Sequence, residues 1–261
     1  MNILETIIFN KKKEVLQQKA LIPFLALEKI IAQQAKPRLL SLKAALETSS
    51  TGIIAEFKRK SPSKGWIAQE ANVQQVAQGY QQAGACGISV LTDEQFFGGN
   101  ISDFTTARKE VDIPLLRKDF MIDEYQIYQA KAMGADVILL IAAALSIDQV
   151  RQLSAVAKDL DLEVLLEIHQ ESELDYIGEN IDMVGVNNRN LATFQTDINY
   201  SLRLGEKIPP AFLKISESGI SQAQTIKDLR AVGFRGFLMG ENFMKENEPA
   251  VALQSFINEL L

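Results

Sequence analysis

The chain has 261 residues, of which 47% are hydrophobic and 23% charged, with a formal net charge of -6 at pH 7. These values exclude disordered, collagen-like and coiled-coil proteins, and the acidic balance disfavours broad nucleic-acid or anionic-membrane binding. The single cysteine, Cys86, excludes an intramolecular disulfide and favours a reducing compartment. The longest apolar run, residues 137–145, is too short to cross a membrane, and the N-terminus shows no signal peptide. We therefore expect a cytoplasmic protein with a sizeable core.

Residues 1–50 come first and have no flexible linker behind them. Helical patterns cover 2–19 and 39–47, and Ile3, Ile7, Val15 and Leu16 fall on one side of the first. We expect residues 1–50 to form a helical extension packed on residues 51–261, so that 1–261 is a single domain.

From residue 53 onward, short β-rich apolar runs alternate with amphipathic helical patterns. The eight runs are 53–57, 87–91, 115–118, 137–141, 163–168, 183–187, 212–216 and 236–239. The clearest helical patterns cover 72–83, 124–133, 146–160 and 222–231, with Asp123 and Ser146 as N-caps. Such alternation predicts a parallel sheet, and eight units predict an α/β fold, a (β/α)8 TIM barrel with an N-terminal helical extension. A doubly wound open sheet is the alternative, although no Gly-x-Gly-x-x-Gly follows the first run.

Polar residues at the ends of these runs are the candidate site, because barrel active sites lie at the carboxyl ends of the strands. In the first run, Glu56 and Lys58 share a face by alternation. Such an inward-facing pair either belongs to a functional site or forms a structural buried salt bridge. Arg59, Lys60 and Lys64 follow in the next loop. With Lys58 they predict a local cationic strip, and a solvated loop is the alternative.

The third and fifth runs end in opposite charges. Alternation turns Lys118 and Glu167 toward one cavity, where each can shift the pKa of the other. His169, the only histidine, shares the parity of Glu167. A structural role is the favoured interpretation of His169, and a catalytic role is the alternative.

The last three runs end in polar or small residues. Asn187 and Arg189 suit the recognition of hydroxyls and anions, with an Asn-rich turn as the alternative. Ser218, Gly219 and Gly240 let backbone N–H groups approach a phosphate, with ordinary glycine turns as the alternative. The sequence shows no metal-ligand pattern, nucleophile elbow or Walker loop. We therefore expect cofactor-free acid–base chemistry on a small phosphorylated molecule.

The segment 54–63, Ile-Ala-Glu-Phe-Lys-Arg-Lys-Ser-Pro-Ser, resembles the first-strand signature of the indole-3-glycerol-phosphate synthase family. The resemblance continues in order through 91–93, 96–99, 116–120, 167–169, 187–191, 216–220 and 239–241. It implies a lyase (decarboxylase) of tryptophan biosynthesis, an aromatic amino-acid pathway. The reaction it implies converts 1-(2-carboxyphenylamino)-1-deoxyribulose 5-phosphate to indole-3-glycerol phosphate, CO2 and water, without a cofactor.

The same resemblance implies roles for individual residues. Lys118 would be the general acid on the sugar carbonyl, and Glu167 would carry protons during dehydration. Lys58 would contact the substrate carboxylate, while Glu56 would hold the lysine network. The residues implied to bind the substrate are Ser61, Phe97, Phe120, Asn187 and Arg189, and those implied to bind its phosphate are Ser218, Gly219 and Gly240.

Glu241 departs from a simple phosphate site, because a carboxylate directly after Gly240 would repel phosphate. We expect its side chain to point away. A phosphoribosylanthranilate isomerase or a tryptophan synthase α-like lyase is the closest alternative, which the Glu-x-Lys strand and the following Lys-Ser-Pro-Ser disfavour. A non-catalytic phosphometabolite sensor would need neither Lys118 nor Glu167. We expect a phosphorylated small molecule as the partner, with no nucleic acid, no membrane, no metal and no cofactor, and a monomer with a weak dimer as the alternative.

Overall fold

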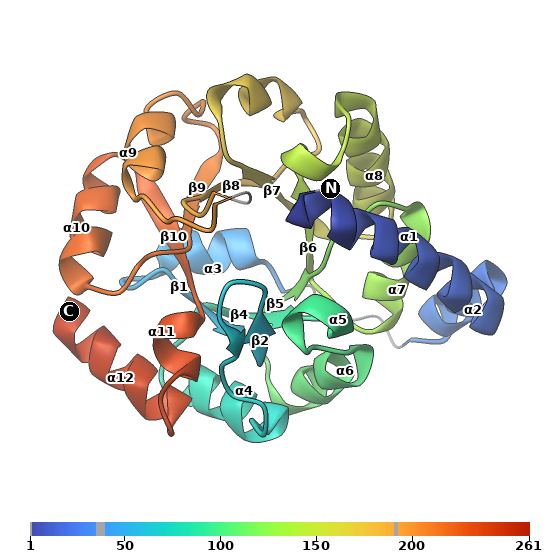
Figure 1. The fold of residues 1–261 in the computed structure, drawn as a ribbon, viewed down its shortest axis with the longest axis horizontal. Coiled ribbons are helices and arrows are strands. Elements are labelled where there is room, and N and C mark those ends of the chain that lie inside the picture. Colours follow the sequence, from blue (N-terminus) through green and yellow to red (C-terminus); the bar gives the residue numbers. More distant parts are fainter. Residues whose placement is uncertain (1, 35–39, 191–192) are drawn as a thin grey trace.

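The computed structural model describes residues 2–34, 40–190 and 193–261, and eight parallel strands form its centre (Figure 1). They close into a barrel in the order β1-β10-β9-β8-β7-β6-β5-β4. The strands are β1 (Ile53–Phe57), β4 (Gly87–Leu91), β5 (Leu115–Lys118), β6 (Val137–Ile141), β7 (Glu163–Ile168), β8 (Met183–Asn187), β9 (Leu213–Glu217) and β10 (Phe234–Met239). The prediction of a (β/α)8 barrel is confirmed, and the open sheet is wrong.

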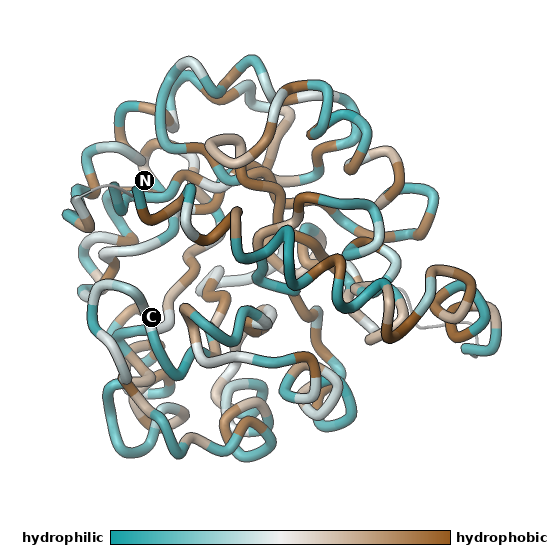
Figure 2. The backbone as a smooth tube through the Cα atoms, turned by 45° about the vertical axis from the view of Figure 1, so that its right-hand side comes forward, coloured by the Kyte–Doolittle hydropathy of each residue, from teal (hydrophilic) through white to brown (hydrophobic). Residues whose placement is uncertain are grey.

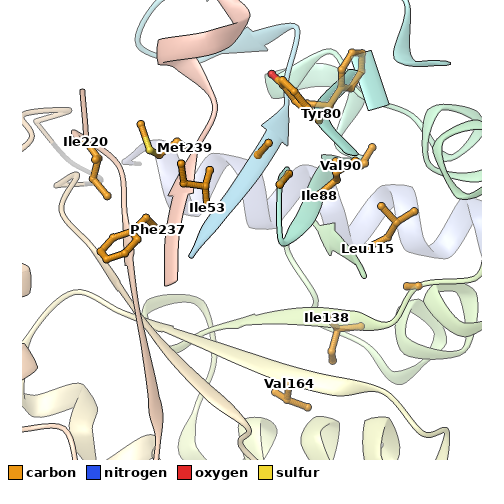
Figure 3. Close-up of a cluster of buried hydrophobic side chains, with 14 of the residues drawn as sticks. Ile53, Tyr80, Ile88, Val90, Leu115, Ile138, Val164, Ile220, Phe237 and Met239 are labelled. Atoms are coloured by element: carbon orange, nitrogen blue, oxygen red, sulfur yellow. The ribbon is translucent and has the colours of Figure 1, made fainter. Parts of the chain in front are cut away.

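The alternation of side chains along each strand creates two apolar layers. The outer layer packs against the helices and includes Ile53, Ile88 and Leu115, which project from neighbouring strands in Figure 3. The inner layer fills the barrel and includes Ile54 and Leu165. All eight strands are therefore buried on both faces, which fixes their register.

Helices follow the strands around the outside of the barrel. They are α4 (Val73–Gln82), α5 (Glu94–Phe97), α6 (Ile101–Glu110), α7 (Glu124–Ala132), α8 (Ile147–Asp159), α9 (Asn199–Gly205), α10 (Ala223–Ala231), α11 (Glu241–Met244) and α12 (Pro249–Leu260), with the 3-10 turns η1 (Ala142–Ala144) and η2 (Glu171–Tyr176). The predicted caps are confirmed, since Asp123 accepts from the Tyr125 N–H and Ser146 forms a capping box with Gln149. A short hairpin, β2 (Lys60–Ser61) and β3 (Gly65–Trp66), lies in the loop after β1.

The N-terminal extension contains α1 (Ile3–Leu21), α2 (Phe24–Gln33) and α3 (Leu42–Thr48). Ile7 and Val15 are buried as predicted, but the assignment of Leu16 to that side is wrong, because its side chain is 68% exposed. The residue after Val15 lies about 100° further round the helix, away from the barrel. Helix α2 was not predicted from the sequence. The helix predicted at 39–47 corresponds to α3, and its predicted first residue, Leu39, lies outside the described residues.

The extension covers both ends of the barrel, with α1 in front and α3 behind in Figure 1. Leu42 and Leu46 of α3 join the inner core at the amino-terminal end of the strands. Glu163, the first residue of β7, accepts hydrogen bonds from the backbone N–H groups of Leu42 and Lys43 at 2.8 and 3.2 Å. This carboxylate accepts hydrogen bonds from the N–H groups at the start of α3 and so holds α3 against the amino-terminal end of the barrel.

Helix α1 is anchored by a buried lysine. Lys11 is 1% exposed, and its Nζ lies 3.0 Å from Asp93 and 2.8 Å from Asp119, the residues that follow β4 and β5 closely. Arg117 also pairs with Asp119, at 3.1 Å. These pairs hold α1 over the carboxyl ends of the strands, which we call the mouth of the barrel.

Figure 2 shows a hydrophobic centre of strands and helices whose outer turns are hydrophilic, the pattern of a water-exposed shell around a barrel. Within residues 2–34, 40–190 and 193–261, no helix combines the length and the hydropathy needed to span a bilayer.

Candidate active site

A cavity of about 560 Å³ opens at the mouth of the barrel. The structure brings together the twelve residues for which the family resemblance implies a catalytic, substrate-binding or phosphate-binding role. The predicted residues that line the cavity are Glu56, Lys58, Ser61, Phe97, Lys118, Phe120, Glu167, Asn187, Arg189, Ser218, Gly219 and Gly240. They come from loops and strand ends far apart in the sequence, which the closed barrel places around one space.

Lys118, the last residue of β5, lies between two glutamates. Its ammonium Nζ is 2.7 Å from Glu167 Oε2 and 2.8 Å from Glu217 Oε2. All three side chains are at least 87% buried, since Lys118 is 13% exposed and the glutamates 3% and 2%. Burial alone would lower the pKa of Lys118, but the carboxylates outweigh it and raise that pKa above its usual range. Lys118 is therefore an ammonium at neutral pH.

The two glutamates differ in pKa although both touch Lys118. Burial favours the protonated form of Glu167, yet Lys118, His169 and Asn187 outweigh burial and lower the pKa to about 2. For Glu217, burial dominates and raises the pKa to about 7. The neighbouring carboxylates Glu167 and Glu56 also raise the pKa of Glu217, and the second oxygen of each carboxylate differs in its contacts. Glu167 Oε1 accepts from Asn187 at 3.1 Å, whereas Glu217 Oε1 is buried without a hydrogen-bond partner among the described residues.

Glu56 and Lys58 form the predicted pair on β1. Lys58 Nζ donates to Glu56 Oε1 at 2.5 Å, and both side chains line the cavity. Gly240 packs against Glu56, because a Cβ at position 240 would lie 2.7 Å from Glu56 Oε1. A side chain there would displace the carboxylate, so Gly240 also shapes the acid–base pair.

The turn after β9 has a backbone suited to anion binding. Ser218 and Gly219 both have positive φ, 67° and 76°. A Cβ on Gly219 would lie 2.3 Å from Thr196 Cγ2, so only glycine fits. Ser218, Gly219 and Gly240 lie together on the cavity wall, where backbone N–H groups can face a phosphate.

Apolar side chains close another side of the cavity. The rings of Phe97 and Phe120 lie 6.0 Å apart at 38°, a tilted arrangement that aromatic pairs favour. Ile3, Leu4 and Ile7 of α1 line the same cavity. The N-terminal extension is thus part of the site and not only of the fold.

A polar bridge spans three loops at the rim. Arg189 Nη1 donates to Ser63 Oγ at 3.0 Å, and Arg189 Nη2 donates to Glu241 Oε2 at 3.2 Å. Lys64 Nζ lies 3.7 Å from Glu241 Oε1. Glu241 therefore lines the cavity and directs its carboxylate toward Arg189 and Lys64.

The predicted cationic strip is only half correct. Lys58 and Lys64 line the cavity, but Arg59 pairs with Asp103 at 2.5 Å, and Lys60 donates to the Gln95 carbonyl at 2.9 Å. Arg59 and Lys60 fall outside the cavity lining of the described residues. The chain at the start of the hairpin β2–β3 turns Arg59 toward α6 and Lys60 toward α5, a local structure that charge counting along the sequence could not show.

His169 lies beside Glu167 and outside the cavity lining of the described residues. Its Nε2 is 3.4 Å from Glu167 Oε1, and its Nδ1 is 3.9 Å from Glu173 Oε2. The ring thus contacts the Glu167 carboxylate without lining the cavity, which favours a supporting over a catalytic role.

Sequence reasoning missed Glu217 as a site residue. The seventh run was predicted at 212–216, whereas β9 covers Leu213–Glu217. With the correct register, Glu217 shares the inward parity of Leu213 and Ile215, which belong to the inner core. Alternation would therefore have found Glu217 if the strand had been placed one residue later.

Across residues 2–34, 40–190 and 193–261, no group of three or more His, Cys, Asp or Glu side chains is placed to hold a metal ion.

A closed barrel with charged side chains gathered in a cavity at the carboxyl ends of its strands is the architecture of a (β/α)8-barrel enzyme. Residues 4–256 match the family model described as indole-3-glycerol phosphate synthase. The chain is 52% identical over 259 residues to the indole-3-glycerol phosphate synthase of Bacteroides thetaiotaomicron, covering 99% of both chains. It is 40% identical over 265 residues to that of Polaromonas naphthalenivorans, also covering 99% of both. The chain belongs to the indole-3-glycerol phosphate synthase family.

Solved structures with low identity share the barrel alone. The orotidine 5'-monophosphate decarboxylase of Sulfolobus solfataricus is 12% identical, with a TM-score of 0.60 over 81% of this chain and 98% of that one. KGPDC from Streptococcus mutans is 14% identical, with a TM-score of 0.58 over 80% of this chain and 96% of that one.

Proposed function

We propose that this protein is a lyase that converts 1-(2-carboxyphenylamino)-1-deoxyribulose 5-phosphate to indole-3-glycerol phosphate, CO2 and water. The observation that carries the proposal is the Lys118 ammonium between Glu167 and Glu217 at the barrel mouth, in a chain of this family. The reaction has three parts. The aromatic carbon attacks the sugar carbonyl, the carboxylate leaves as CO2, and a hydroxyl leaves as water.

Lys118 acts in the first step, the attack of the aromatic carbon on the sugar carbonyl. Its pKa lies above the usual range, so the side chain is cationic at every working pH. As the ring carbon attacks, negative charge builds on the carbonyl oxygen, and a fixed ammonium stabilises that charge and donates a proton to it. Lys118 is the proposed general acid.

Glu167 and Glu217 serve the later proton transfers. Glu167 is ionised because its pKa is about 2, so it is ready to accept a proton once CO2 has left. In the proposed dehydration that proton comes from the ring carbon beside the nitrogen, and Glu167 gives it to the departing hydroxyl, so that a C=C bond and water form. Glu217 balances the charge of Lys118 from the other side, at 2.8 Å.

Lys58 and Glu56 act at the aromatic end. Lys58 faces the cavity and is the proposed contact of the substrate carboxylate, while Glu56 orients Lys58 through their 2.5 Å bond. Attack by the ring carbon on the carbonyl, and later departure of the hydroxyl, draw electrons from the anilino nitrogen, and the Glu56 carboxylate stabilises the positive charge that develops there.

The remaining residues position the substrate. Asn187 binds sugar oxygens, Arg189 positions the aromatic end, and Phe120 packs on the ring with Phe97 beside it. The other proposed contacts are Ser61 in the pocket wall and Ser218, Gly219 and Gly240 at the phosphate.

Residues 1–50 and 51–261 act as one domain, because α1 contributes Ile3, Leu4 and Ile7 to the cavity. We expect a cytoplasmic monomer, with a weak dimer as the alternative, and the lone Cys86 suits a reducing compartment. Gel filtration with light scattering measures the oligomeric state.

A turnover assay with three candidate substrates tests the function. The purified protein is given the carboxyphenylamino ribulose phosphate, phosphoribosylanthranilate or indole-3-glycerol phosphate, and the indole absorbance is followed. We expect indole absorbance to rise with the first substrate only. Binding of that substrate without turnover would instead indicate a non-catalytic sensor.

A further inference from the structure

The cavity is formally neutral, although its substrate is proposed to be a multiple anion. Five cations and five carboxylates line it: Lys58, Lys64, Lys118, Arg189 and Lys245, and Glu56, Asp119, Glu167, Glu217 and Glu241. An anion that enters this space finds each of the deeper cations already paired. An anion that binds there must share a cation with an internal carboxylate or displace that carboxylate from its cation.

Most of these carboxylates are held firmly. Asp119, Glu167 and Glu217 are at most 3% exposed and lie within 3.1 Å of their cations. Glu56 is 5% exposed and 2.5 Å from Lys58. Moving any of them would leave a buried charge unpaired, which is costly.

Glu241 differs from the other four. Its side chain is 35% exposed, and its distances to Arg189 and Lys64, 3.2 and 3.7 Å, are the longest of these cation–carboxylate pairs. A partly exposed pair of this kind contributes little free energy. Of the carboxylates that line the cavity, Glu241 therefore needs the least free energy to be displaced from its cations.

Arg189 is incompletely bonded in this arrangement. Nη1 donates to Ser63 and Nη2 donates to Glu241, but the buried Nε has no hydrogen-bond partner among the described residues. Nε and Nη2 form one edge of the guanidinium, which can hold two oxygens of a single oxyanion. Glu241 occupies only half of that edge, and the unpaired Nε indicates a ligand that uses both donors.

We propose that Glu241 is an exchangeable counter-ion, which holds Arg189 and Lys64 in the free protein and yields them to an oxyanion of the substrate. The inference rests on the proposed function for the identity of the substrate. Phosphate and carboxylate share the necessary chemistry, and the proposed substrate carries both. In the free protein Glu241 keeps the two cations in place, and it sets the affinity for anions by competing with them.

Substitution of Glu241 tests the proposal through a gain of binding, which a misfolded variant would not show. Titration calorimetry measures the affinity of the wild type and Glu241→Gln for inorganic phosphate and, separately, for 2-aminobenzoate. We expect roughly two- to fivefold tighter binding of at least one probe, the range that a partly exposed ion pair provides. The probe that gains identifies the end of the substrate that replaces Glu241.

Two controls isolate the contact from the general change of charge. Glu94→Gln removes an exposed acid from α5 at the same end of the barrel, and we expect no gain from it. In an Arg189→Met background, Glu241→Gln should lose most of its effect, because the cation it competes for is gone.

The opposite results would overturn the proposal. These are unchanged or weaker affinity of Glu241→Gln for both probes, absence of binding by either protein, or an equal gain from Glu94→Gln. None of these measurements needs turnover. If the protein fails the turnover assay but Glu241→Gln binds phosphate more tightly, the proposed function is contradicted. The proposed counter-ion role of Glu241 would still be supported.

Discussion

Glu217 extends from the end of β9 across the barrel mouth and places its Oε2 2.8 Å from the Nζ of Lys118 on β5. Burial raises the pKa of Glu217 to about 7, against 4.5 for a free glutamate. The group that balances the proposed general acid therefore titrates near neutral pH, while Lys118 itself stays charged.

This titration predicts a pH dependence of kcat/KM, which reports on the free enzyme. As the pH rises through about 7, Glu217 ionises and adds a negative charge to the cavity, so an anionic substrate binds less well. We expect kcat/KM to fall as the pH rises through about 7. The Glu217→Gln variant should not show this fall. The substrate phosphate also titrates near this pH, but equally for both proteins. If kcat/KM of Glu217→Gln fell with pH as it does in the wild type, a group other than Glu217 would be responsible for the titration.

Glu167→Gln should separate the two halves of the reaction. Its carboxylate is proposed to act after CO2 has left, so we expect overall turnover to fall at least about a hundredfold, with indole formation slowed more than CO2 release. Parallel measurement of CO2 and indole absorbance checks this order. If turnover matched the wild type, Glu167 would have no catalytic role.

Ser218→Asp should weaken substrate binding by at least about tenfold, because it places a carboxylate beside the proposed phosphate. The control is Ser218→Ala, which keeps the backbone N–H groups and should bind much more like the wild type. Equal KM values for the aspartate variant and the wild type would remove the phosphate site from this turn.

Lys11→Met should destabilise the protein strongly. Lys11 is buried between Asp93 and Asp119, and removal of one partner from such a pair costs about 3 to 5 kcal/mol of unfolding free energy. Urea unfolding at pH 7 measures this cost. Lys19→Met on the same helix breaks a pair whose side chains are 39% and 31% exposed, and it should cost less than about 1 kcal/mol.

The cost of Lys11→Met should depend on pH. Burial favours protonated Asp119, but Lys11 and Arg117 outweigh it and lower the pKa from 3.8 to about 2. The ionised Asp119 therefore contributes stability above about pH 3.8 and loses it as the pH falls toward 2. The difference between Lys11→Met and the wild type should shrink across that window. A difference that is constant with pH would show that Asp119 is not the group left unpaired.

Periodicity was enough to predict the barrel and most of its site. Strand alternation placed Glu56, Lys58 and Glu167 on the inner face without reference to the structure, because inward and outward positions alternate regardless of neighbours. Glycine turns likewise indicated the loops after β9 and β10.

The failures have local physical causes. Arg59 and Lys60 turn away because a hairpin, held by a two-residue pairing, redirects their side chains. Helix α2 packs Phe24 on Tyr128 of α7, with ring centroids 4.4 Å apart, and its stability comes from this long-range contact. Glu241 finds Arg189 across the cavity, and only the closed barrel brings these two residues together.

Single-turnover kinetics of Lys118→Met test the central claim most directly. Enzyme in excess is mixed with the carboxyphenylamino ribulose phosphate, and CO2 release and indole absorbance are followed for the variant and the wild type. We predict that the wild type forms both products one to one, and that the variant binds the substrate but forms both at least about a hundredfold more slowly. Formation of CO2 and indole by Lys118→Met at the wild-type rate would contradict the account.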